Sequence, residues 1–318
     1  MTKELICTTP SDVAELLTML TYKRPSSGAT EAAFIRRFIL PLGTERDEYG
    51  NHWLAIGNAP ILWSCHTDTV HTKEGKQRVL YGDGMASVEK GECLGADCGT
   101  GVWLMSEMIH AGVAGTYVFH ADEEIGGYGS DYIACDTPGK LKGIDFAIAF
   151  DRKGTNEIIT HQMSKRCASD LFATSLAECL RPLAYKASNG GTFTDTANYA
   201  SLIPECTNIS VGYYKQHTKG EHQDVTHALR LRDALREADW SRLVVARDPS
   251  VPVLSWKDGA KWREAELDNW IDSQADLDDA PYTDFGRYVR RNADDVAAFL
   301  EALGYDQDDV DTFIWSDK

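Results

Sequence analysis

Residues 60–68 read PILWSCHTD, an apolar run that ends on a histidine and an aspartate. Such a run, without polar alternation, is typical of a strand buried on both faces, as in a parallel sheet. Strands of this kind are predicted at 60–65, 116–121, 145–150 and 207–212, and helices at 99–110, 168–180 and 222–246. Buried strands that alternate with helices predict an α/β domain with a largely parallel central sheet.

The composition argues against several classes of protein. The chain has 318 residues, 43% of them hydrophobic, and a formal net charge of −17 at pH 7. Nucleic-acid binding needs clustered Lys and Arg, so this charge argues against such a partner. No apolar run approaches the roughly 20 residues of a membrane span, and residues 1–17 lack the pattern of a secretory signal. Together with eight cysteines that have no framework spacing, this predicts a soluble, cytoplasmic protein with reduced thiols and no membrane partner.

The last fifth of the chain differs in composition from the rest. The stretch 248–254 (DPSVPVL) marks an expected boundary between a larger domain, 1–250, and an appendage, 251–318. The appendage holds 17 Asp and Glu residues against 7 Lys and Arg, and it contains no histidine. Its apolar positions, such as Val296 and Phe299, recur at helical spacing. We expect an acidic, mainly helical appendage that supplies no metal ligand.

Residues that commonly bind metal ions follow the predicted strands. His66 and Asp68 come directly after the first strand, and a carboxylate near a histidine can fix the imidazole while the other ring nitrogen binds metal. Four further segments carry similar residues: 95–97 (GAD), 121–127 (ADEEIGG), Asp151 after the strand 145–150, and His217 in 212–221 (GYYKQHTKGE). Functional residues of α/β folds collect at the carboxyl ends of strands, so these segments are candidates for one site.

Taken together, the segments favour a centre with two metal ions. Burying several carboxylates side by side is costly unless cations neutralise them. Two histidines and three carboxylates, one of them bridging, suit two divalent ions with open positions for hydrolysis. We expect zinc, with cobalt or manganese as alternatives. Cys93 and Cys98 flank Asp97, but one C-x4-C pair without a second favours reduced structural cysteines.

The ordered motifs resemble those of the co-catalytic di-zinc exopeptidases, which include carboxypeptidase G, peptidase T and the bacterial leucyl-type aminopeptidases. The motifs are HTDT (66–69), GAD (95–97), DEEIGG (122–127), FDR (150–152), GGTFTDT (190–196) and H-T-x-x-E (217–221). The resemblance covers roughly residues 10–245 and implies a three-layer α/β/α fold with a mixed, largely parallel sheet. Carboxypeptidase-G-like members insert a lid and dimerisation domain, whereas only 38 residues (152–189) separate Asp151 from Gly190 here. The resemblance therefore implies a lidless member without a lid-type dimer, and the oligomeric state stays open.

The same resemblance implies a role for each metal ligand. Asp97 would bridge the two ions. His66 and Asp151 would complete one site, and Glu124 and His217 would complete the other.

Two further carboxylates match catalytic positions of the superfamily. Glu123 matches the general base, which takes a proton from water and delivers it to the leaving amine. Asp68 matches the residue that orients His66.

Substrate-binding residues are predicted less directly. Asp195 matches the aspartate of the superfamily's Gly-Gly-Thr-Asp segment. A donor must also meet the developing oxyanion, and its candidates are Tyr213, Tyr214 and His161. Arg152 and its neighbour Lys153 either contact an anionic group of the substrate or are solvated charges at the start of a loop.

Three functions are compatible with these residues. The leading hypothesis is a zinc-dependent aminopeptidase or dipeptidase-like hydrolase that cleaves an amide bond in a small peptide. The second is a deacylase that acts on an N-acyl amino acid or another small amide. The third is a catalytically silent metal-binding interaction module, against which the intact Glu123 argues, because a binding module needs no base.

Overall fold

A computed structural model describes residues 10–250 of the chain. The predicted acidic appendage, 251–318, lies outside the described residues, and its helical character stays a prediction.

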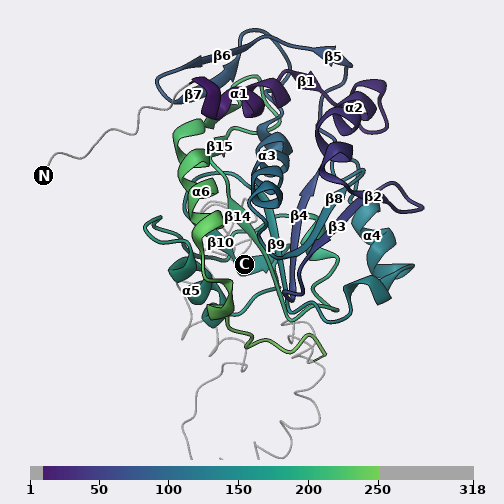
Figure 1. The fold of residues 1–318 in the computed structure, drawn as a ribbon, viewed down its shortest axis with the longest axis vertical. Helices are drawn as coiled ribbons and strands as arrows, with labels where there is room; N and C mark the ends of the chain where they lie inside the picture. Colours follow the sequence, from purple (N-terminus) through teal and green to yellow (C-terminus); the bar gives the residue numbers. More distant parts are fainter. Residues whose placement is uncertain (1–9, 251–318) are drawn as a thin grey trace, which may run out of the picture. The chain divides into compact units, whose positions relative to one another are not determined.

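The centre of the fold is an eight-stranded sheet with the strand order β13-β10-β14-β9-β4-β8-β3-β2 (Figure 1). Its strands are β2 (Glu45–Arg46), β3 (His52–Ile56), β4 (Ile61–His66), β8 (Gly115–His120), β9 (Phe146–Arg152), β10 (Glu157–Ile159), β13 (Lys186–Ser188) and β14 (Glu205–Ser210). The four middle strands, β14, β9, β4 and β8, run parallel to one another. Antiparallel pairs flank them, formed by β3 with β8 and by β10 with β14. The predicted α/β fold with a mixed, largely parallel sheet is confirmed.

Helices cover both faces of this sheet. The helices are α1 (Pro10–Met19), α2 (Ala29–Phe34), α3 (Ala96–His110), α4 (Tyr128–Cys135), α5 (Asp170–Cys179) and α6 (Val225–Glu237). Shorter helical turns are Ile35–Ile39, of π type, and the 3-10 turns Leu40–Leu42, Pro138–Leu141, Asp195–Ala197 and Trp240–Arg242.

Successive residues of β4 enter two different hydrophobic clusters, because side chains alternate between the faces of a strand. Trp63 and Cys65 pack in the cluster that includes residues of α1, α3, α5 and α6. Leu62 packs in the cluster that includes Ile133 of α4. The strand is buried on both faces, which explains why its sequence shows no polar alternation.

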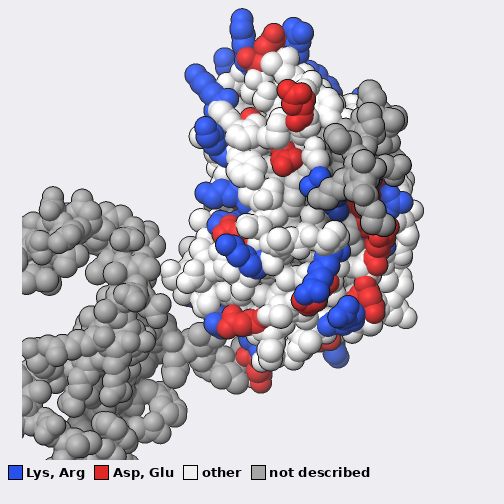
Figure 2. Space-filling model, turned by 90° about the vertical axis from the view of Figure 1, so that its left-hand side faces the viewer, with Lys and Arg blue, Asp and Glu red and all other residues white. Residues whose placement is uncertain are grey.

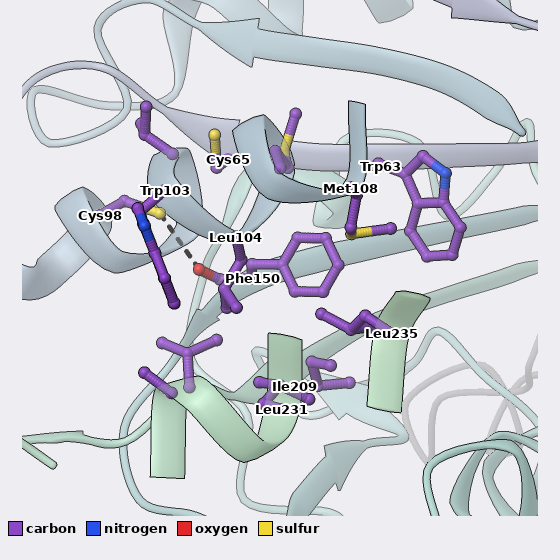
Figure 3. Packing of buried hydrophobic residues seen from close by; sticks show 14 of the residues in the cluster. Trp63, Cys65, Cys98, Trp103, Leu104, Met108, Phe150, Ile209, Leu231 and Leu235 are labelled. Atoms are coloured by element: carbon purple, nitrogen blue, oxygen red, sulfur yellow. Dashed lines mark hydrogen bonds between the residues drawn. The ribbon is translucent and has the colours of Figure 1, made fainter. Parts of the chain in front are cut away.

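Helix α3 packs on strands β4 and β9 and also contacts α6, on the same face of the sheet (Figure 3). Its residues Trp103, Leu104 and Met108 are almost wholly buried. At its first turn the Cys98 thiol donates a hydrogen bond to the backbone oxygen of Phe150 in β9, with Sγ and O 3.1 Å apart. The packing therefore fixes the first turn of α3 against the sheet.

Short strands form three smaller sheets. A four-stranded sheet has the order β15-β16-β7-β6, and two pairs are β1 with β5 and β11 with β12. The strands are β1 (Tyr22–Lys23), β5 (Gly75–Lys76), β6 (Val79–Gly82), β7 (Met85–Val88), β11 (His161–Gln162), β12 (Lys165–Arg166), β15 (Tyr213–Tyr214) and β16 (His222–Asp224). The four-stranded sheet connects the segment just after His217 to the hairpin of β6 and β7.

The helix predicted over 222–246 is wrong at both ends. Residues His222–Asp224 pair with β7 as strand β16, and the helix ends at Glu237. The Asp224 side chain caps α6 by accepting a hydrogen bond from the backbone N–H of His227, which sets the start of the helix.

The described surface carries charges of both signs. On the face shown in Figure 2, Lys and Arg lie interspersed with Asp and Glu and with uncharged surface. Within residues 10–250, no helix is long and apolar enough to cross a membrane.

Substituting Gly101 tests how closely α3 packs on the sheet. A Cβ at this position would come within 3.0 Å of Cys98 Sγ and of the Phe150 carbonyl oxygen. We expect Gly101→Ala to lower the free energy of unfolding by about 1–3 kcal/mol, because overpacking forces neighbouring atoms to shift. The control is Gly139→Ala, where a Cβ would meet nothing within 4 Å. Thermal or denaturant unfolding that gave equal stabilities for the two variants would contradict the close packing.

Candidate metal centre

Two predicted ligands lie at the carboxyl ends of neighbouring parallel strands. His66 is the last residue of β4, and Asp151 lies near the end of β9. Nε2 of His66 is 3.5 Å from Oδ1 of Asp151. Asn208 of β14 fixes the backbone of Asp151, because its Oδ1 accepts the Asp151 N–H at 2.9 Å and its Nδ2 donates to the Asp151 carbonyl at 2.7 Å. The sheet itself therefore sets the distance between these two side chains.

Asp97 lies between the two predicted histidine ligands. Its Oδ1 is 3.1 Å from Nε2 of His66, and its Oδ2 is 3.2 Å from Nε2 of His217. The residue follows Gly95, which has a left-handed backbone with φ of 73°, and Asp97 itself departs from helical geometry. The carboxylate thus presents one oxygen to each histidine, which is the arrangement that a bridging ligand needs.

Glu124 and His217 come together from two loops. Oε1 of Glu124 lies 3.2 Å from Nε2 of His217. That oxygen is buried and accepts no hydrogen bond from the part of the chain that the structure describes. A buried carboxylate oxygen without a hydrogen bond is costly, and a cation at this position would satisfy it.

Asp68 connects His66 to the loop that carries the two glutamates. Its Oδ1 lies 3.3 Å from Nδ1 of His66, the ring nitrogen that faces away from Asp97. Its two oxygens also accept the backbone N–H groups of Glu123 and Glu124, at 3.2 and 3.1 Å. One buried carboxylate therefore orients the imidazole and fixes the turn at 123–124.

Burial dominates the electrostatics of the carboxylates. It raises the pKa of Glu123 well above its ordinary value, raises that of Glu124, and raises that of Asp151 to about 8. Burial acts in the same direction on Asp97, but hydrogen bonds with His217 and His66 outweigh it and hold the Asp97 pKa far below its ordinary value. The adjacent carboxylates of Asp97 and Glu124 raise the pKa of His217 to about 11. The cluster has a strong affinity for positive charge.

The donor set fits two divalent ions. Ligand atoms of Asp97, Glu124 and His217 lie within 4.8 Å of one another. His66 and Asp151 lie on the other side of Asp97, and Cys98 Sγ falls within the same range of both. The Cys98 thiol already donates to a backbone oxygen, as described above, which agrees with a structural cysteine. Imidazole and carboxylate donors of this kind suit zinc, and also cobalt or manganese.

A pocket opens beside this cluster. It is lined by Asp97, Glu123, Glu124, Asp151, Arg152, Lys153, Thr192, Phe193, Tyr213, Gln216 and His217. Of the residues predicted to contact substrate, Tyr213, Arg152 and Lys153 lie on it. The Tyr213 hydroxyl donates to Oδ1 of Asp151 at 3.2 Å, so in this geometry it positions a predicted ligand rather than pointing a free donor at the pocket.

Asp195, Tyr214 and His161 are absent from the pocket lining formed by the described residues. Asp195 is buried, and its Oδ2 lies 3.2 Å from Nδ1 of His120. The Tyr214 ring stacks on His222, with centroids 5.3 Å apart. This geometry does not favour a direct contact of Asp195, Tyr214 or His161 with substrate. Such a contact stays a prediction.

Glu221 has a positioning role that the sequence analysis does not assign. Its carboxylate accepts the backbone N–H groups of four consecutive residues, Leu94 to Asp97, at 2.9, 3.2, 2.7 and 3.3 Å. It lies on the same loop as His217, so it joins the loop of one ligand to the turn of another. In the sequence, Glu221 is the glutamate that ends the H-T-x-x-E motif, 217–221.

Arg24 is a second positioning residue that the sequence does not indicate. It is fully buried and donates to the carbonyl oxygens of Thr67 at 2.8 Å and Gly95 at 3.4 Å. The guanidinium therefore links the backbone that follows His66 to the backbone that precedes Asp97. A single arginine in the stretch TYKRPSSG gives no sequence signal for this role.

Comparison with known proteins supports the fold. No protein-family model and no curated protein sequence matches the chain. Solved structures do match. The aminopeptidase PepT of Bacillus cereus has a TM-score of 0.58 at 15% identity, over 71% of this chain and 97% of that chain. A tripeptidase of Staphylococcus aureus has a TM-score of 0.58 at 14% identity, over 70% of this chain and 96% of that chain. An aminopeptidase of the archaeon Desulfurococcus kamchatkensis has a TM-score of 0.55 at 13% identity, over 70% of this chain and 93% of that chain.

These likenesses define a class of fold. The chain has the α/β fold of these peptidases, with helices on both faces of a mixed, largely parallel sheet, as the resemblance of its motifs predicts.

Glu221→Gln tests the connection between the two ligand segments. The amide keeps one acceptor oxygen but loses the charge that strengthens four hydrogen bonds, and charge-assisted bonds contribute about 1.5–3 kcal/mol each. We expect a lower melting temperature and weaker binding of the ion that His217 is predicted to hold, measured by thermal unfolding and metal titration. The control is Glu92→Gln, because the partly exposed Glu92 also accepts a backbone N–H, from Thr72. Equal behaviour of the two variants would show that Glu221 does not position the site.

Proposed function

We propose that the chain is a metallopeptidase that hydrolyses an amide bond in a small peptide, as an aminopeptidase or dipeptidase-like enzyme with two zinc ions. One observation carries the proposal: the two oxygens of the buried Asp97 face two different histidines, at 3.1 and 3.2 Å. Each of the two positions has a further carboxylate, Asp151 on one side and Glu124 on the other. The aminopeptidase and tripeptidase activities named for similar structures point to the same class of substrate.

The ions would be held by His66 and Asp151 on one side, by Glu124 and His217 on the other, and by Asp97 between them. When bound, two divalent ions activate water as a nucleophile and polarise the scissile carbonyl. The chain's own residues set the geometry for this chemistry, because strands β4 and β9 fix one side and the anchored loops fix the other.

In this proposal Glu123 acts as the general base. It lines the pocket, and its Oε2 lies 3.9 Å from Nε2 of His66, on the side of the ligand cluster. Its backbone N–H is fixed by Asp68, so the side chain projects from an anchored turn. Burial raises its pKa, and a base with a raised pKa can both take a proton from water and return it to the leaving amine.

A substrate panel tests the proposed activity. Aminoacyl anilides, dipeptides and N-acetyl amino acids would be assayed with added zinc, cobalt or manganese. Cleavage of anilides or dipeptides supports the peptidase, whereas cleavage of N-acetyl amino acids alone would favour a deacylase. A fully metal-loaded protein that hydrolyses no member of the panel would overturn the proposal.

Asp97→Ala tests the shared ligand. A bridging carboxylate gives one ligand oxygen to each ion. We therefore expect this variant to lose both metals. His66→Ala and His217→Ala should each weaken mainly one. Elemental analysis per folded chain measures the outcome, with Asp233→Ala as control at a half-exposed aspartate paired with Arg232. Normal metal content in Asp97→Ala would refute the assignment.

Glu123→Gln separates chemistry from metal binding. The amide preserves the size of the side chain and removes the base, so we expect turnover to fall by roughly 10²-fold or more while metal content is kept. Steady-state kinetics on the best substrate, together with elemental analysis, provide the measurement. Near-normal turnover would mean that another group takes the proton. The control is Glu178→Gln, a surface glutamate paired with Arg181.

A further inference from the structure

Two cationic side chains line the same pocket as the predicted metal ligands. Arg152 ends strand β9, one residue after Asp151, and Lys153 follows it. The remaining charged residues on the pocket are His217 and the carboxylates of Asp97, Glu123, Glu124 and Asp151. The pocket therefore has an acidic side, where metal ions would bind, and a basic side.

The guanidinium of Arg152 is held in a defined orientation. Its Nε donates to Oε2 of Glu157 at 2.8 Å, and its side chain is only 11% exposed. The other oxygen of Glu157 accepts a hydrogen bond from the hydroxyl of Ser188 at 2.8 Å. Glu157 and Ser188 lie on the adjacent parallel strands β10 and β13, so the sheet fixes the position of the arginine.

This anchoring leaves most of the guanidinium's donors available. A guanidinium has five N–H donors, and Glu157 engages only the one on Nε. Within residues 10–250, neither terminal nitrogen of Arg152 donates a hydrogen bond to another residue. Lys153 is exposed and forms no ion pair with any described residue. Glu157 can balance only one of these two positive charges, so the basic side of the pocket keeps an excess positive charge.

We propose that this basic side is a carboxylate subsite, so that the enzyme selects small substrates that carry a free carboxylate near the scissile amide. The inference rests on the peptidase function proposed above. The planar fork of terminal nitrogens on Arg152 matches a carboxylate in a two-bond arrangement, and Lys153 adds a mobile positive charge. Arg152 and Asp151 line the same pocket, so a carboxylate bound by Arg152 would lie in the pocket that receives the reacting carbonyl.

The subsite belongs to the central sheet itself. Only 38 residues, 152–189, separate Asp151 from Gly190, and Arg152 opens this segment while Ser188 lies near its end. Recognition of a carboxylate by these strands needs no lid domain. The carboxylate can be the terminal carboxylate of a short peptide or the side chain of an acidic residue, and the two sources are separated by experiment.

Matched substrate pairs provide the test, with the full chain loaded with zinc. The first pair is Ala-Ala and its C-terminal amide, which differ in the terminal carboxylate. The second pair is the p-nitroanilides of Glu and Gln, which differ in the side-chain carboxylate. For the wild type we expect kcat/KM to be about 10- to 100-fold higher for the acid in one of the pairs, the range of a charge-assisted hydrogen bond. The pair that shows the preference identifies the source of the carboxylate.

Variants then assign the preference to residues. Arg152→Met should remove most of the preference for the acid, and Arg152→Lys, which keeps the charge but not the fork, should remove part of it. Lys153→Met lies at an exposed position that should tolerate substitution. It should reduce the preference for the acid less, and the preference that remains should depend less on salt concentration. The matched control is Arg166→Met, which removes a surface arginine paired with Asp170 and should leave the preference unchanged.

The outcomes separate the inference from the function on which it rests. No hydrolysis of any substrate by the wild type would overturn the proposed function and this inference with it. Hydrolysis without preference for either acid would leave the peptidase standing and overturn the subsite. A preference that persists unchanged in folded Arg152→Lys and Lys153→Met would place carboxylate recognition elsewhere and also overturn it.

Discussion

The rest of the site depends on the buried carboxylate of Asp97, whose two oxygens face two different histidines. Its oxygens lie 3.1 and 3.2 Å from His66 and His217, which belong to distant segments of the chain. For one carboxylate to serve both, its backbone must be held firmly. Glu221 and Arg24 provide this, since Glu221 accepts the N–H groups leading to Asp97 and Arg24 binds the carbonyl oxygen of Gly95.

The crowding of carboxylates gives the site its chemical character. Burial raises the pKa of Glu123 and Asp151, while hydrogen bonds with the histidines hold the pKa of Asp97 low. Groups with such opposed proton affinities are typical of functional sites rather than of surfaces. Divalent cations would stabilise the ionised forms of the predicted ligands, and Glu123, which adjoins the predicted ligand Glu124 in sequence, would remain available for proton transfer.

The sequence predicted the parts of this structure that follow from simple periodicity and order. The apolar run before His66 is a buried strand, and the candidate ligands that follow four predicted strands do come together beyond the carboxyl ends of strands. The helix over 222–246 could not be predicted correctly, because His222–Asp224 form a strand only through pairing with β7, far away in the chain. The anchoring role of Arg24 also depends on tertiary contacts. Nothing near it in sequence indicates that it binds carbonyl oxygens of two remote segments.

The two halves of the site are fixed by different means. His66 is 1% exposed and lies within a strand of the central sheet, whereas the His217 side chain is 46% exposed and lies on a loop with a left-handed backbone. The first half therefore inherits its geometry from the sheet. The second depends on hydrogen bonds that Glu221 and Asp68 accept from backbone N–H groups of neighbouring loops. Arg152 belongs to the rigid half, since the strands that position Asp151 also position Glu157. A substrate group bound by Arg152 would thus be aligned by the same sheet that aligns the ligands, and alignment of this kind is what hydrolysis requires.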